Sequence, residues 1–221
     1  MEYYCGGVWI SVKFAMTTAY CLTYHHDISH VGQLDQQNKW PQRSPLTYEI
    51  RSKFYFPNYT REGVHWFEND IGLVRVDKSH YWQNYPRFMK SWQRWGEITT
   101  KPVLMHGFGR TENGDYSTFL KYMTGRLHLK DSYSQKNCDI PAVKMEMAFC
   151  MEPMEPFDEI DNGDMGNVVY YDVKDPENYG PENRVILGIV SFKYGDPRNI
   201  ILTNVSYYEE WIRSTIIENP Y

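Results

Sequence analysis

The sequence predicts an all-β domain with one helix at its C-terminal end. Short runs rich in β-branched and aromatic residues recur along the 221 residues, and Gly, Pro, Asn and Asp separate them. Helical periodicity is clear only after position 204, and no segment repeats internally. Many strands with a single terminal helix indicate a barrel or a sandwich.

The predicted elements follow in chain order. Strand-like runs span 8–12, 47–56, 71–76, 102–105, 167–171, 185–192 and 200–203. The helix shows apolar side chains at three- and four-residue spacing, namely Val205, Tyr208, Trp211, Ile212 and Ile216. Ser206 and Glu209 have the spacing of a capping box at its start. All-β domains of this length commonly form one unit, so we expect a single domain over 1–221.

Composition argues against two classes of partner. The formal net charge is −5 and the isoelectric point about 5.8, which provides no basic surface for nucleic acid. No apolar run approaches the roughly 20 residues that span a bilayer, and no signal-peptide apolar segment follows Met1. We expect neither nucleic-acid nor membrane partners, and a mature or recombinant segment whose secretion signal was removed or never included.

Cysteines and sequons together favour an extracellular protein. The four cysteines include no Cys-x-x-Cys pair, which indicates structural disulfides rather than a redox or zinc site. Asn58-Tyr59-Thr60 and Asn204-Val205-Ser206 are candidate N-glycosylation sites.

The segment Gly163-Asp164-Met165-Gly166 is the most informative motif. It resembles the Gly-Asp-Ser-Gly-Gly-Pro signature of chymotrypsin-like serine proteases. Further segments resemble that family's motifs in the family's order: Cys5-Gly6-Gly7-Val8-Trp9-Ile10, Thr17-Thr18-Ala19-Tyr20-Cys21, Asn69-Asp70-Ile71-Gly72-Leu73-Val74, Gly107-Phe108-Gly109, Phe149-Cys150, Gly188-Ile189-Val190-Ser191-Phe192 and Thr203-Asn204-Val205-Ser206-Tyr207-Tyr208. The preserved order over residues 5 to 217 argues against a chance match.

The resemblance implies an architecture and two disulfides. Members of this family fold as two six-stranded antiparallel Greek-key barrels followed by a C-terminal α-helix. In this chain the resemblance implies a first barrel over about 1–90, a second over 96–204 and a helix over 205–217. It pairs Cys5 with Cys21 and Cys138 with Cys150.

The resemblance also locates the catalytic triad positions. Tyr20 occupies the histidine position, Asp70 keeps the aspartate, and Met165 stands in place of the serine. A thioether has no acidic proton, and a phenol with a pKa of about 10 is no general base at neutral pH. We expect Asp70 to accept a hydrogen bond from Tyr20 or from neighbouring backbone amides. Gly163 and Met165 remain as an oxyanion hole that no nucleophile uses.

The specificity pocket is predicted to be closed. Counted from Met165, Glu159 lies at its floor, and Lys193 and Ile200 stand where the family has wall glycines. Because a buried carboxylate needs a counter-charge, we expect Lys193 to enter the slot and pair with Glu159, with Ile200 narrowing the rest. In the alternative, Lys193 points to solvent, and a water or a shifted loop satisfies Glu159.

Asp164 is expected to lack its usual cation. In active members a new hydrophobic N-terminus inserts its amine beside the aspartate before the nucleophile. Here the sequence opens Met1-Glu2-Tyr3-Tyr4 almost directly on the first cysteine. Burial of Asp164 without that amine would be costly.

A His-x3-His pair, His26 and His30, has a spacing that suits zinc. The pair follows Cys21 in what the resemblance makes a surface loop. We therefore expect no metal and no cofactor.

Within the family, the chain resembles the scabies mite inactivated protease paralogues, which are related to the group 3 mite allergens. That resemblance implies a secreted, proteolytically inactive homologue that binds host proteins and interferes with complement. Two alternatives stay open: a decoy that captures protease inhibitors or substrates, and an enzyme with residual serine-type endopeptidase activity. The sequence indicates neither the binding surface nor the oligomeric state.

Overall fold

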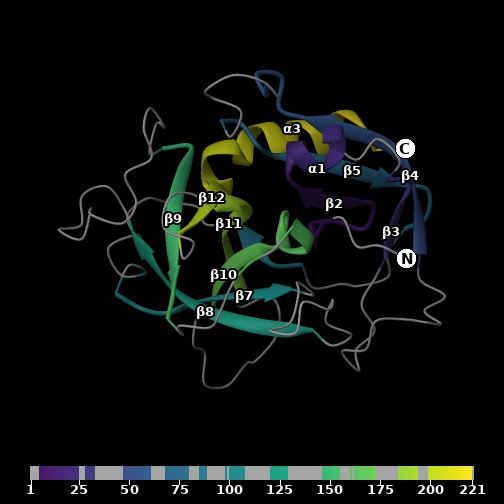
Figure 1. Cartoon of the computed structure of the whole chain (residues 1–221). Helices are drawn as coiled ribbons and strands as arrows, with labels where there is room; N and C mark the ends of the chain where they lie inside the picture. Colours follow the sequence, from purple (N-terminus) through teal and green to yellow (C-terminus); the bar gives the residue numbers. More distant parts are fainter. Residues whose placement is uncertain are drawn as a thin grey trace.

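Two largely antiparallel sheets and a C-terminal helix make up the described part of the protein (Figure 1). The computed structural model describes residues 5–24, 28–32, 47–60, 68–79, 85–88, 98, 100–107, 120–128, 146–154, 160, 162–172, 184–193 and 199–220. The predicted all-β class with a terminal helix is confirmed.

The first sheet is a half-barrel with the strand order β1-β2-β5-β4-β3. Its strands are β1 (Val8–Trp9), β2 (Phe14–Thr17), β3 (His30–Gly32), β4 (Thr47–Tyr55) and β5 (Gly72–Val76). Every pair in this sheet is antiparallel. The five described strands do not close on themselves.

The second sheet closes into a six-stranded barrel. Its strands are β7 (Val103–Gly107), β8 (Lys121–His128), β9 (Ala148–Pro153), β10 (Val168–Asp172), β11 (Arg184–Lys193) and β12 (Ile200–Asn204). β10 pairs with both β7 and β11 and so completes the ring. The short strand β6 (Arg87–Phe88) joins β11 in parallel. The predicted division between 90 and 96 lies outside the described residues and stays a prediction.

The C-terminal helix begins one turn later than its periodicity suggests. Val205–Tyr208 form a 3-10 turn, η5, and α3 spans Glu209–Glu218. The predicted capping box is wrong, because the Asn204 side chain already accepts the Ser206 amide at 3.1 Å. Glu209 is engaged by Arg213 instead, at 2.7 Å. No helix among the described residues is long and apolar enough to cross a membrane.

Two short elements near the start were not predicted. The expected strand 8–12 ends at Trp9, because the Ser11 hydroxyl accepts the Phe14 amide at 3.2 Å and turns the chain back into β2. α1 (Ala19–Tyr24) follows β2 directly, and the Thr18 hydroxyl caps it by accepting the Cys21 amide at 3.2 Å. Elements of four and six residues are too short to show a period.

β2 carries the core on both of its faces. Phe14 and Met16 join a cluster that contains Ile189 of β11 and Tyr208 of η5. Ala15 faces the opposite way, into a smaller cluster with Val74. A separate cluster fills the closed barrel. The residues expected at the catalytic positions therefore lie near an apolar junction of the two sheets, where full burial of each large side chain contributes about 1.5–3 kcal/mol.

Candidate functional site

Asp70 is the most enclosed charged group at this junction. Its side chain is 0% exposed, and its carboxylate accepts the Tyr20 backbone amide at 2.7 Å and the Ser191 hydroxyl. The Ala19 amide is a further donor to it. Burial raises the pKa of Asp70 to about 7, against these hydrogen bonds, which favour the ionised form. Of the two expected kinds of donor, Tyr20 or neighbouring backbone amides, the structure shows the backbone amides of Ala19 and Tyr20.

Two hydrogen bonds from distant elements hold the backbone at Asp70 and the side chain of its neighbour Asn69. Thr203 of β12 donates its hydroxyl to the Asp70 carbonyl at 2.9 Å. The preceding residue, Asn69, has a positive φ of 60°, a region that Asn tolerates better than most residues. The Tyr208 hydroxyl holds the Asn69 side chain at 3.2 Å. Asp70 is thus positioned by β12, η5 and α1 together.

Tyr20 lies on α1 and is half-buried. Its ring stacks on Tyr24 one turn later, with centroids 5.0 Å apart and planes 14° apart. The main chain at this position therefore contacts the carboxylate, while the aromatic ring packs along the helix.

Met165 lies beside the same helix. Its carbonyl oxygen accepts a hydrogen bond from the Gly6 amide at 2.6 Å. The same oxygen lies 3.8 Å from Sγ of Cys21, the residue that follows Tyr20 on α1. The three positions that the resemblance assigned to the triad, Tyr20, Asp70 and Met165, are thus gathered around α1. Met165 itself is half-buried.

The 162–167 segment is anchored to both sheets. It starts with a 3-10 turn, η3 (Asn162–Asp164), in which Gly163 is buried. Gly166 has a φ of 86°, and a Cβ there would lie 2.3 Å from Thr17 Oγ1 of the first sheet. On the other side, the Gly166 amide donates to the Val190 carbonyl of β11 at 2.8 Å. The positive φ and the lack of room for a Cβ both require glycine at position 166.

Asp164 is buried, with 4% of its surface exposed. The Asn167 side-chain amide donates to its Oδ1 at 3.1 Å, and the Asn167 main chain donates to its carbonyl at 3.0 Å. Both groups pack on Gly107, where a Cβ would lie 2.3 Å from Asp164 Oδ1. The neutral amide of Asn167 thus binds the carboxylate for which the sequence suggested no donor.

The predicted specificity pocket is described only in part. Glu159 lies outside the described residues, so its ion pair with Lys193 stays a prediction. Lys193 is exposed at the end of β11, and the choice between its two expected orientations stays a prediction. Ile200, its partner across the ladder, is 1% exposed and belongs to the core of the closed barrel.

The predicted Cys5–Cys21 disulfide is confirmed. It ties the entry of β1 to α1, next to Tyr20. Cys150 on β9 is also disulfide-bonded. Its expected partner, Cys138, lies outside the described residues.

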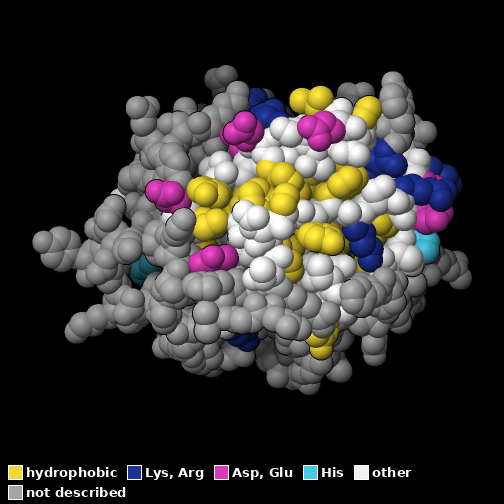
Figure 2. Space-filling view, turned by 90° about the horizontal axis from the view of Figure 1, so that it is seen from above, with side chains coloured by type: hydrophobic (Ala, Val, Ile, Leu, Met, Phe, Trp, Pro, Cys, Tyr) yellow, Lys and Arg dark blue, Asp and Glu magenta, His cyan; other side chains and the backbone are white. Residues whose placement is uncertain are grey.

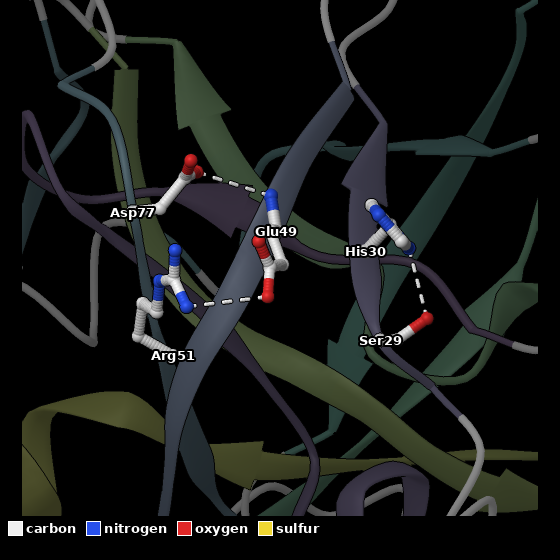
Figure 3. Close-up of polar contacts among 5 residues, drawn as sticks. All are labelled: Ser29, His30, Glu49, Arg51 and Asp77. Atoms are coloured by element: carbon white, nitrogen blue, oxygen red, sulfur yellow. Dashed lines mark hydrogen bonds and ion pairs between the residues drawn. The ribbon is translucent and has the colours of Figure 1, made fainter.

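The candidate zinc pair is only half described, because His26 lies outside the described residues. His30 lies on the exposed strand β3, and its Nδ1 is hydrogen-bonded to Oγ of the neighbouring Ser29 at 2.8 Å (Figure 3).

The neighbouring strand β4 bears an ion pair between Arg51 and Glu49 at 3.3 Å, and the Glu49 amide donates a hydrogen bond to Asp77. No cluster of three metal-ligating side chains occurs within the described ranges.

Sequence reasoning missed two residues of this site. Ser191 lies 121 positions from Asp70, and its motif was recognised without a role for the hydroxyl. Asn167 follows directly on the Gly163–Gly166 motif, and the sequence assigns it no role. In both cases the signal was present in a motif, but only the fold shows which carboxylate each residue serves.

The fold, the order of its strands and the enclosed aspartate beside α1 define a trypsin-like serine protease domain. A family model described as Trypsin matches residues 2–212. The chain belongs to the trypsin family.

Proposed function

We propose that this trypsin-family protein is a proteolytically inactive homologue that acts by binding another protein. The observation that carries the proposal is the pair of residues gathered around α1: Met165 at the nucleophile position and Tyr20 at the base position.

Neither side chain supplies the chemistry of acyl transfer. The Met165 thioether has no proton that a base could remove, and it is a poor nucleophile toward a carbonyl. The usual base, an imidazole, titrates near neutral pH, whereas a phenol stays protonated there. Asp70 would orient an imidazole in an active enzyme. Here it accepts hydrogen bonds from backbone amides and from the Ser191 hydroxyl. The oxyanion-hole remnant at Gly163 and Met165 would then stabilise a transition state that nothing forms.

Secretion and the nature of the partner extend the same proposal. The Cys5–Cys21 disulfide supports folding in an oxidising compartment. The resemblance to the inactivated mite paralogues favours a host protein as the partner, with complement components first among the candidates. A decoy that captures inhibitors would use the same fold with a different ligand.

An active-site probe separates a binder from an enzyme. A fluorophosphonate should fail to label the full-length protein at up to a large molar excess, while trypsin in the same tube is labelled stoichiometrically. Met165→Ala is the matched control, because it removes the side chain at the nucleophile position without adding a hydroxyl. Stoichiometric labelling of the natural chain would overturn the proposal of inactivity.

The proposed binding is tested by its effect on complement activity and on protease inhibitors, and not only by capture of a protein. The purified chain should reduce complement-mediated lysis of red cells in a dose-dependent way. A parallel titration with plasma serpins and active trypsin measures inhibitor capture. Sparing of trypsin without any effect on lysis would replace complement interference by the decoy function.

A further inference from the structure

The two sequons lie in opposite environments. Asn58 is exposed on a turn in which the Tyr59 amide donates to the Phe56 carbonyl at 2.9 Å. The Asn58 carbonyl accepts the Asn69 side chain at 3.2 Å, so the main chain fixes the turn. No hydrogen bond from a described residue involves the Asn58 side-chain amide, which leaves it available for modification.

Asn204 is 0% exposed at the end of β12. Its Nδ2 donates to the Glu146 carbonyl at 2.8 Å, and its Oδ1 accepts the Ser206 amide at 3.1 Å. A glycan on Nδ2 would need open space where the barrel is packed, and it would disturb both bonds. Folded molecules therefore have no room for a sugar at this sequon.

A surface cavity of about 490 Å³ adjoins the Asn58 turn. Its lining includes Phe56, Asn58, Thr60, Asn69, Met147 and Tyr207. Two of the three sequon side chains thus line the cavity themselves. Tyr207 is 41% exposed, and Phe56 is anchored from behind by Trp211, with ring centroids 5.6 Å apart. Seen from the side of α3, the surface of the described residues shows a group of apolar side chains (Figure 2).

We propose that Asn58 carries an N-linked glycan whose first N-acetylglucosamine packs in this cavity against Phe56 and Tyr207, and that Asn204 stays unmodified. A pyranose presents an apolar face of C–H groups, which suits the negative face of an aromatic ring. The tether places the sugar beside these rings, so packing costs little additional ordering. A protein ligand would have no such tether. The proposal requires passage through the secretory route, which is part of the proposed function.

Site occupancy is tested on the full chain with an added cleavable secretion leader, expressed in insect cells. The leader supplies the route, so the result does not depend on whether the natural protein is secreted. Release by peptide N-glycosidase in heavy-oxygen water marks each occupied asparagine for mass spectrometry. We expect a mark at Asn58 and none at Asn204. An unmarked Asn58, or a marked Asn204 in the folded, secreted protein, overturns the assignment.

Two matched variants remove one sequon each and leave both asparagines in place. Thr60→Ala should lose the single glycan and its gel shift. Ser206→Ala should change neither, since the Ser206 hydroxyl makes no hydrogen bond to the described residues and its backbone amide, which binds Asn204, is retained. Loss of a glycan in Ser206→Ala contradicts the proposal.

Packing of the sugar is tested by a thermal double-mutant cycle. After trimming to one N-acetylglucosamine, the protein should melt about 2 °C above Thr60→Ala, a shift that corresponds to a small stabilisation for a domain of this size. Tyr207→Ala should abolish this increment. Tyr55→Ala is the control, because Tyr55 is 52% exposed and does not line the cavity. An increment that is absent, or that survives Tyr207→Ala, overturns the packing and leaves the cavity open to a protein ligand.

Discussion

Two buried carboxylates near the catalytic positions, Asp70 and Asp164, are held in different ways. Asp70 is reached by two amides at the start of α1 and by the Ser191 hydroxyl of β11. Asp164 is reached by the amide of Asn167, only three positions away. The donors of Asp70 come from distant parts of the chain, whereas Asn167 belongs to the same short loop.

The two acids depend on the fold to different degrees. The donors around Asp70 belong to α1 and β11, so removing the acid would leave polar groups of this helix and this strand buried and unpaired. The Asn167 donor of Asp164 is local, and a single substitution at 167 removes it. The network around Asp70 thus gives this carboxylate a role in folding that does not depend on catalysis.

The largest expected effect is that of Asp70→Ala. It leaves the Ser191 hydroxyl and two backbone amides without an acceptor, and at about 1–3 kcal/mol for each buried unpaired group the free energy of unfolding should fall by about 4 kcal/mol. Urea unfolding near pH 5 measures the change. Asp70→Asn keeps the shape and one acceptor, and should lose less than half as much. Equal losses in the two variants would show that the amide oxygen kept in Asp70→Asn does not satisfy these donors.

The pH dependence of stability tests the burial of Asp70. Because burial raises the pKa of Asp70 to about 7, the folded state holds a proton that the unfolded chain releases above its ordinary value of 3.8. Stability from this group is therefore fully present below about pH 4 and is lost as the pH rises toward about 7. Between about pH 5 and pH 7 the loss should be about 2 kcal/mol. Asp70→Asn should abolish this slope, and a slope unchanged in that variant would assign it to other groups.

Asn167→Ala probes the second carboxylate and should have a smaller effect. It removes the side-chain donor to Asp164 and should lower the free energy of unfolding by about 1–2 kcal/mol. In an Asp164→Asn background the same substitution should cost less, because no buried charge then depends on the amide. Denaturant unfolding of the four proteins gives the coupling energy. A coupling near zero would mean that Asn167 fills space and does not serve Asp164.

Sequence patterns located several strands but missed β8, whose eight residues coincide with none of the predicted runs. β4, β5, β11 and β12 all lie within two residues of the predicted runs. α1 was missed because its start depends on the Thr18 cap and on its disulfide to Cys5. Among the site residues, the surroundings of Asp70 followed partly from the resemblance. The role of Ser191 did not, since no local pattern links two residues 121 positions apart.

The smallest expected effect concerns activity. Restoring Tyr20→His and Met165→Ser together should not restore cleavage of Lys or Arg peptides. The new imidazole would find Asp70 in place, yet catalysis also requires a positioned substrate. The predicted floor and wall residues of the pocket, Glu159 and Lys193, differ from those of trypsin-like enzymes. Asn167 also packs closely on Gly6, since a Cβ on Gly6 would lie 1.7 Å from Oδ1 of Asn167. Peptide turnover and fluorophosphonate labelling should be measured on the same samples. Labelling without turnover would place the remaining obstacle in substrate binding, while trypsin-like turnover would show that only two side chains separate this protein from an enzyme.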